Sequence, residues 1–139
     1  MKHFIVIAML MGMAGCTSTP LDVKATPVAK TIHTETSYKM LGSCLQQKLQ
    51  NEAGHWAEMR LTFQDWMPSA ELTYLQQINL AGFVETVYVI TLEPKENQTT
   101  LLSLRLNKGL FESAVKKNLS DIENAVKTCE SLIKNAPQS

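Results

Sequence analysis

The sequence has 139 residues, with thirteen Lys and Arg side chains against thirteen Asp and Glu, so its formal net charge is zero. That balance argues against a nucleic-acid binder, because contacts with phosphates require an excess of basic side chains. Hydrophobic residues make up 45% of the chain and charged residues 19%, which excludes a disordered polyampholyte. The length predicts a single domain.

The chain begins with the features of a secretory signal peptide. Lys2 and His3 precede an uninterrupted apolar run over residues 4–11, and small residues follow up to Cys16. A basic start, a short apolar stretch and a small-residue site are the three parts of such a signal. The run is shorter than the roughly 20 apolar residues of a transmembrane helix. The alternative is a buried N-terminal helix or strand, but no polar residue within the run sets an amphipathic period.

The end of this segment, Met-Ala-Gly-Cys over residues 13–16, resembles the lipobox of bacterial lipoproteins. The resemblance covers residues 1–16 only, and Met13 stands where Leu is usual. It implies removal of a signal peptide over residues 1–15 and attachment of a diacylglycerol to Cys16, with further acylation by a fatty acid such as palmitate. By resemblance to proteobacterial lipoproteins, Thr17 in place of Asp implies sorting to the outer membrane, with the domain facing the periplasm.

The next segment, residues 17–37, has the composition of a spacer. Ten of its 21 residues are Thr, Ser or Pro, and no apolar period is visible. We therefore predict that residues 16–37 form the lipidated N-terminus and a flexible tether that holds the domain clear of the membrane. The alternative is that Val23, Val28 or Ile32 docks onto the domain as an edge strand.

Two amphipathic helices bound the remainder of the chain. The first begins at residue 38, where leucines recur every four residues, with Ser37 as its N-cap and Gly54 as its C-terminal stop. The second follows Gly109, where apolar residues recur at spacings of three and four over residues 111–133.

Four strands are predicted between these helices. Apolar and polar residues alternate over 57–64, 70–74 and 102–106, whereas residues 83–92 are β-branched and aromatic on both faces. Short connections require antiparallel neighbours. We therefore predict an α+β fold: a two-layer sandwich in which a four-stranded antiparallel sheet carries an N-terminal and a C-terminal helix on one face. This compact domain spans residues 38–135, and residues 136–139 form a tail.

The two remaining cysteines, Cys44 and Cys129, fall on the apolar faces of the two helices. An even pair in an exported protein predicts a disulfide. In the chain-entropy model, closing the loop of roughly 85 residues between them contributes about 4–5 kcal/mol to the free energy of unfolding. Two reduced, buried thiols are the alternative.

Catalytic and metal-binding patterns are weak. Neither His33 nor His55 has a second ligand at a metal-binding spacing, and no nucleophile elbow is present. Glu85 is the one carboxylate that falls within an otherwise apolar strand, and we expect it to pair with Arg60 or Arg105 across the sheet. We therefore predict a protein that is not an enzyme and needs no cofactor or metal.

Surface aromatic residues offer a binding role instead. Trp56 and Trp66 share the parity of the solvent-facing residues of their strand, which makes them candidate partner contacts. The alternative is that both pack under loops at the strand ends. We predict a non-enzymatic outer-membrane lipoprotein whose periplasmic domain binds another cell-envelope component in an assembly or scaffold role. The alternative function is a periplasmic inhibitor or immunity protein that blocks a toxic envelope-degrading enzyme.

Overall fold

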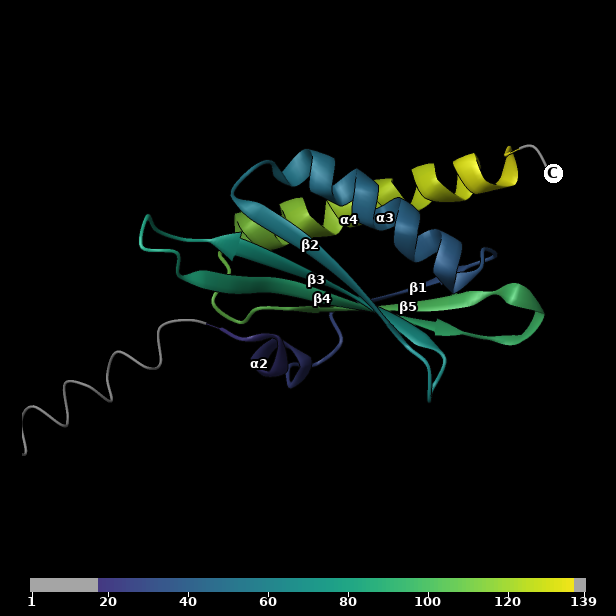
Figure 1. Cartoon of the computed structure of the whole chain (residues 1–139), viewed down its shortest axis with the longest axis horizontal. Coiled ribbons are helices and arrows are strands. Elements are labelled where there is room, and N and C mark those ends of the chain that lie inside the picture. The colour runs from purple at the N-terminus through teal and green to yellow at the C-terminus, as the bar shows by residue number, and fades with distance from the viewer. Residues whose placement is uncertain (1–17, 137–139) are drawn as a thin grey trace, which may run out of the picture.

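The computed structural model describes residues 18–136. The predicted signal peptide, the lipidation site Cys16 and residues 137–139 of the tail lie outside the described residues. Between these limits the chain forms one antiparallel sheet with helices on both faces (Figure 1).

The sheet has five strands in the spatial order β1-β5-β4-β3-β2, and every neighbouring pair is antiparallel. The strands are β1 (Lys30–Thr34), β2 (Ala57–Gln64), β3 (Ser69–Gln77), β4 (Val84–Pro94) and β5 (Thr100–Leu106). A short 3₁₀ turn, η1 (Glu96–Gln98), joins β4 to β5. The order places β4 in the centre, as its apolar sequence predicts, and leaves β1 and β2 at the two edges.

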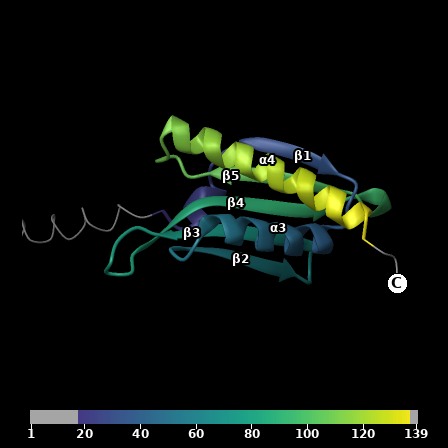
Figure 2. The ribbon, with the colours of Figure 1, turned by 90° about the horizontal axis from the view of Figure 1, so that it is seen from above.

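Two long helices cover one face of the sheet. The helices α3 (Tyr38–Ala53) and α4 (Glu112–Lys134) lie side by side there, as Figure 2 shows from above. The Ser37 hydroxyl accepts a hydrogen bond from the backbone N–H of Met40, and Gly54 ends α3 with a positive φ of 79°. Leucines of α3 and the apolar stripe of α4 pack on the inward side chains of the sheet to form the core.

The disulfide joins these two helices as predicted. Cys44 of α3 and Cys129 of α4 are bonded, with their Cα atoms 5.8 Å apart and a sequence separation of 85. Cys129 is fully buried within the hydrophobic core. The covalent bond therefore ties the first helix of the core to the last.

The α+β class is confirmed, but the predicted four strands and two helices must be corrected to five strands and three described α-helices. The additional elements come from the segment predicted to be a tether. Helix α2 (Pro20–Lys24) packs on the face of the sheet opposite α3 and α4, and β1 pairs with β5. The tether prediction fails because this segment contributes a buried side chain, Val23, and a backbone ladder that begins with the N–H of Ala29 donating to Leu104.

Two large apolar side chains at the ends of core elements lie at the surface. Phe63 at the end of β2 is partly exposed and contacts the edge of the Tyr38 ring, with centroids 6.4 Å apart. Phe111 is exposed because it is the N-cap residue of α4, and the helix begins only at Glu112. Both residues are therefore available for surface contacts.

Candidate functional site: the free edge of the sheet

Strand β2 lies at an edge of the sheet, so half of its backbone groups do not face another strand. Such groups readily pair with an extended segment of another chain. In β2 the backbone N–H and C=O of Met59 point away from β3, and the alternation of a strand gives the same direction to those of Leu61 and Phe63. The state of these outward groups decides whether the edge can bind a partner.

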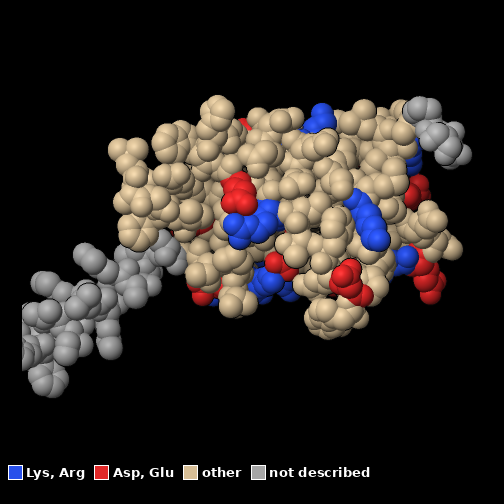
Figure 3. All heavy atoms as spheres, viewed as in Figure 1, with Lys and Arg blue, Asp and Glu red and all other residues tan. Residues whose placement is uncertain are grey.

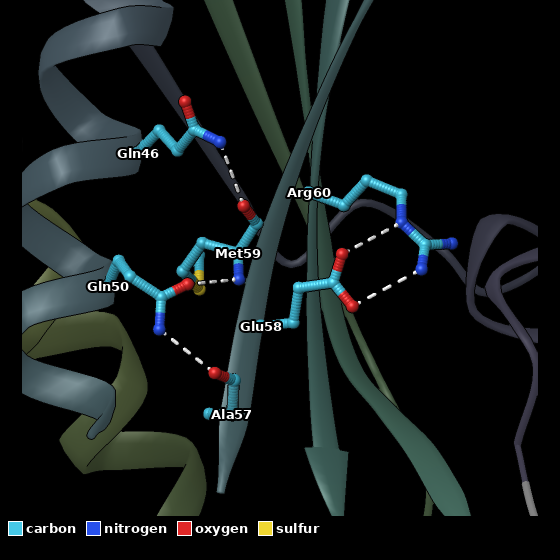
Figure 4. Close-up of polar contacts among 6 residues, drawn as sticks. All are labelled: Gln46, Gln50, Ala57, Glu58, Met59 and Arg60. Carbon is cyan, nitrogen blue, oxygen red and sulfur yellow. Dashed lines mark hydrogen bonds and ion pairs between the residues drawn. The ribbon is translucent and has the colours of Figure 1, made fainter. Parts of the chain in front are cut away.

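Helix α3 covers the first half of this edge with two glutamines (Figure 4). The Gln46 side-chain amide donates to the carbonyl of Met59 at 3.0 Å, and that of Gln50 donates to the carbonyl of Ala57 at 2.9 Å. The Gln50 side-chain carbonyl also accepts the N–H of Met59 at 2.8 Å. These side chains replace a neighbouring strand and block pairing at this part of the edge.

The cover that Gln46 and Gln50 provide does not extend one turn further toward the N-terminus of α3. The position four residues before Gln46 is Gly42, which carries no side chain that could reach the strand. Helix and sheet are packed so closely there that an added Cβ would lie 3.2 Å from Leu92 and 3.3 Å from Leu61. Within residues 18–136, no side chain bonds the outward backbone groups of Leu61 and Phe63. We call Leu61–Phe63 the free edge.

Exposed apolar side chains lie next to the free edge. Trp66 and Met67, in the turn that joins β2 to β3, are 82% and 58% exposed, and Phe63 is also partly exposed. Trp56, before β2, is also largely exposed, so the alternative that both tryptophans pack under loops is wrong. Unpaired backbone groups beside an exposed tryptophan are suited to an extended peptide with an apolar side chain.

The structure does not bring Trp56 and Trp66 together. Trp56 precedes β2 and is 58% exposed, and its carbonyl accepts the N–H of Gln77 at the far end of β3. Trp66 follows the other end of the same strand. The rise of about 3.3 Å per residue in a strand separates the two by roughly 30 Å. They therefore belong to two different surfaces.

One cavity lies between α3, α4 and the sheet, with a volume of about 340 Å³. Its wall includes Tyr74 and Tyr88, whose rings are 5.0 Å apart, and the ion pair between Lys117 and Asp121 at 2.8 Å. Burial raises the pKa of both tyrosines above the ordinary value of a phenol. The hydrogen bond to Asp121 raises the pKa of Lys117. The Tyr88 hydroxyl already donates to the sulfur of Met59 at 3.9 Å, so the cavity presents the hydroxyl of Tyr74 and a paired lysine.

Glu85 does not line this cavity and has neither of the expected arginine partners. Its carboxylate accepts a hydrogen bond from the side-chain amide of Asn107 at 3.0 Å. Arg60 instead pairs with Glu58 on the same strand at 3.3 Å (Figure 4), and Arg105 donates to the carbonyl of Thr26 at 3.1 Å. The expected cross-strand ion pair is therefore corrected to an amide contact.

His33 lies exposed on β1, and His55 lies exposed before β2. Between residues 18 and 136, no three His, Cys, Asp or Glu side chains come together in a way that could hold a metal ion. None of the helices in that part of the chain combines the length and the apolarity of a membrane span.

No protein-family model matches the sequence, and no curated protein matches it with significance.

Proposed function

We propose that this chain is a non-enzymatic lipoprotein of the outer membrane whose domain faces the periplasm and binds another cell-envelope protein in an assembly or scaffold role. The lipid would be attached to Cys16. A disulfide between Cys44 and Cys129 supports this address, because such bonds persist in the oxidising envelope and are rare in the cytosol.

The free edge carries the binding role. An extended segment of the partner would pair with the outward backbone groups of Leu61 and Phe63 and place an apolar side chain against Trp66. Backbone pairing gives affinity in this mode of recognition, and the side-chain contact gives specificity. The glutamines of α3 would fix the register, because Gln46 and Gln50 stop the added strand from extending toward Met59.

Crosslinking in intact cells tests this role, with a photoreactive residue in place of Thr62, whose side chain is exposed. The decisive variant is Phe63→Pro, which removes the outward N–H while leaving the ladder to β3, because proline is tolerated where the N–H of an edge strand faces solvent. Phe63→Ala is the matched control, since it removes the same ring and keeps the N–H. We expect the crosslinked partner to be lost in Phe63→Pro and retained in Phe63→Ala.

Two further variants separate the surfaces. Trp66→Ala should weaken the same crosslink, and Trp56→Ala should leave it unchanged. If Phe63→Pro and Trp66→Ala both keep every crosslink, the free edge does not bind a partner. Capture of an envelope-degrading enzyme at this edge would support the inhibitor function instead. The anchor is tested separately by metabolic labelling with palmitate, which Cys16→Ser should abolish.

A further inference from the structure

The first described residue is fixed at one end of the sheet. The carbonyl of Ser18 accepts a hydrogen bond from the backbone N–H of Thr86 at 2.9 Å. Thr86 is the third residue of β4, which starts at Val84 after the loop from β3. Ser18 therefore lies beside the β3–β4 hairpin and not at the end of a long tether.

This end of the molecule exposes several large apolar side chains, which we call the apolar end. Leu80, at the tip of the β3–β4 loop, is 91% exposed, and Phe83 is 58% exposed. Trp56 lies beside this hairpin, where its carbonyl accepts the N–H of Gln77 and where it lines a shallow hollow with Val84. The members of the apolar end are Trp56, Ile78, Leu80, Phe83, Val84 and Phe111.

Phe111 joins the apolar end because of the way β5 leads into α4. The N–H of Asn107, directly after β5, donates to the carbonyl of Val87 in β4 at 2.9 Å. The N-terminus of α4 therefore lies at the same end as the hairpin, and the views of Figures 1 and 2 agree on this placement.

The hairpin is also free of charge. No Asp, Glu, Lys or Arg occurs between Glu71 and Glu85. In the space-filling view of Figure 3, the surface at this end is mainly tan, whereas the coloured charges gather over the middle and the far part of the molecule. An uncharged loop with exposed apolar side chains avoids the largest cost of entering a lipid environment.

The loop also satisfies much of its own backbone. The side-chain carbonyl of Asn79 accepts the N–H groups of Ala81 and Phe83 at 3.0 and 3.2 Å, and the Gln77 side-chain amide donates to the carbonyl of Asn79 at 2.8 Å. Backbone groups that are already paired lose less when water is removed. The loop can therefore approach lipid without leaving these groups unbonded.

The length of chain before Ser18 determines what the apolar end faces. Cys16 is two residues earlier in the sequence, and two residues of even a fully extended chain span at most about 7 Å. A lipid on Cys16 would hold the bilayer surface against this end of the domain. No flexible spacer of some twenty residues is left between them.

We propose that the apolar end inserts into the interfacial region of the bilayer that holds the lipid anchor, and that this contact fixes the orientation of the domain. The inference rests on the proposed lipidation of Cys16. Aromatic and leucine side chains are well suited to the boundary between headgroups and acyl chains. The free edge and Trp66, at the opposite end of β2, then face away from the membrane toward a partner.

The two native tryptophans provide the test, because one lies at each end of β2. The full chain, produced in cells that process it and labelled with palmitate, is reconstituted into phosphatidylcholine vesicles with brominated acyl chains. The variant Trp66→Phe reports on Trp56, and Trp56→Phe reports on Trp66. We expect bromine to quench Trp56 several-fold more strongly than Trp66, with little dependence on salt because the hairpin carries no charge.

A second pair of variants keeps the outcome independent of the anchor. Leu80→Asp combined with Phe83→Asp, in the Trp66→Phe background, should retain the palmitate label and lose the quenching of Trp56. Met67→Asp in the same background is the matched control, because Met67 is as exposed as Phe83 but lies at the far end, and it should change nothing.

Labelled protein in which Trp56 is not quenched, or in which both tryptophans are quenched equally, would overturn the inserted orientation and leave the anchor intact. Protein that carries no palmitate would overturn the proposed anchor, and this inference with it. If Trp56 stays unquenched while Leu80→Asp abolishes a crosslink to another protein, the apolar end is a protein-binding surface instead.

Discussion

The two faces of the sheet are held in different ways. On one face, α3 and α4 bury a continuous apolar layer and are joined by the disulfide between Cys44 and Cys129. On the other face, α2 buries one apolar side chain, Val23, and polar contacts supply most of the remaining attachment. Lys24 pairs with Glu71 at 2.7 Å, and the carbonyl of Thr26 accepts a hydrogen bond from Arg105.

This difference shows which part of the fold depends on the other. A helix of five residues is not stable alone, because forming the first turn costs more than it gains. Helix α2 therefore forms only when it docks on a sheet that α3 and α4 have already stabilised. We expect the α2 face to open locally at a lower free energy than the α3–α4 face.

Removal of the disulfide should have the largest effect among the tests of this contrast. The double variant Cys44→Ala and Cys129→Ala frees a loop of 85 residues, and the chain-entropy model predicts a loss of about 4–5 kcal/mol in the free energy of unfolding. Urea unfolding monitored by circular dichroism measures this loss. The wild-type protein under reducing conditions should fall to the stability of the variant, and the variant should not respond to the reductant. Equal stability of all three samples would contradict the role of the bond.

Matched truncations on the two faces compare the packing directly. Leu45→Ala in the main core should destabilise the protein by about 2–5 kcal/mol, because it removes a fully buried side chain and leaves a cavity. Val23→Ala should cost about 1–2 kcal/mol, because it removes two buried carbon atoms where Leu45→Ala removes three. Hydrogen exchange at the amide of Thr86, which is bonded to Ser18, separates the two effects.

In Val23→Ala the Thr86 amide should exchange faster while the core amides of β4 keep their protection. In Leu45→Ala all of these amides should lose protection together. If Val23→Ala lowers the protection of the core as much as that of Thr86, the two faces open as one unit and the contrast is wrong.

The same contrast explains how much the sequence could predict. The periods of α3, α4 and β2 to β5 extend over enough residues to be recognised, and their apolar faces placed Cys44 and Cys129 within reach of each other. The tether prediction fails for residues 18–37 because their signals are weak: α2 contributes one buried side chain, and β1 is rich in threonine. The available signal was Thr19 followed by Pro20 and Asp22, which is the pattern of a capped first turn.

The candidate site was predictable only in part. Strand parity placed Trp66 at the surface, but the role of Gln46 and Gln50 depends on β2 lying beside α3, which only the tertiary structure defines. The expected partner of Glu85 was wrong for a similar reason. The register places Glu85 opposite Gln76. It places Arg60 opposite Thr73 and Arg105 opposite Val89, so neither arginine lies across from Glu85.

Lowering the pH should have the smallest and most local effect, because a single carboxylate, Asp22, caps α2. The side chain of Asp22 accepts hydrogen bonds from the backbone N–H and the hydroxyl of Thr19, both at 2.9 Å, and these bonds lower its pKa below the ordinary 3.8. Because the pKa of Asp22 is lower in the folded state than in the unfolded state, the ionised cap stabilises α2 at any pH above the ordinary pKa of the carboxyl. This stabilisation is lost as the pH falls through the pKa of Asp22 in the folded state. Exchange at the Thr86 amide, corrected for its intrinsic pH dependence, should therefore rise below about pH 4.

Asp22→Asn should remove this acid response, because the amide of asparagine does not titrate in this range while its carbonyl can still accept a hydrogen bond from Thr19. Glu123→Gln is the control on the opposite face. The ion pair of Glu123 with Lys30 at 2.8 Å also lowers the pKa of that carboxyl, but it joins α4 to β1 and not α2 to the sheet. The Thr86 amide should keep its acid response in Glu123→Gln. A response that persists in Asp22→Asn would show that the attachment of the N-terminal segment does not depend on this cap, and that buried Val23 and the contacts of Thr26 hold the α2 face on their own.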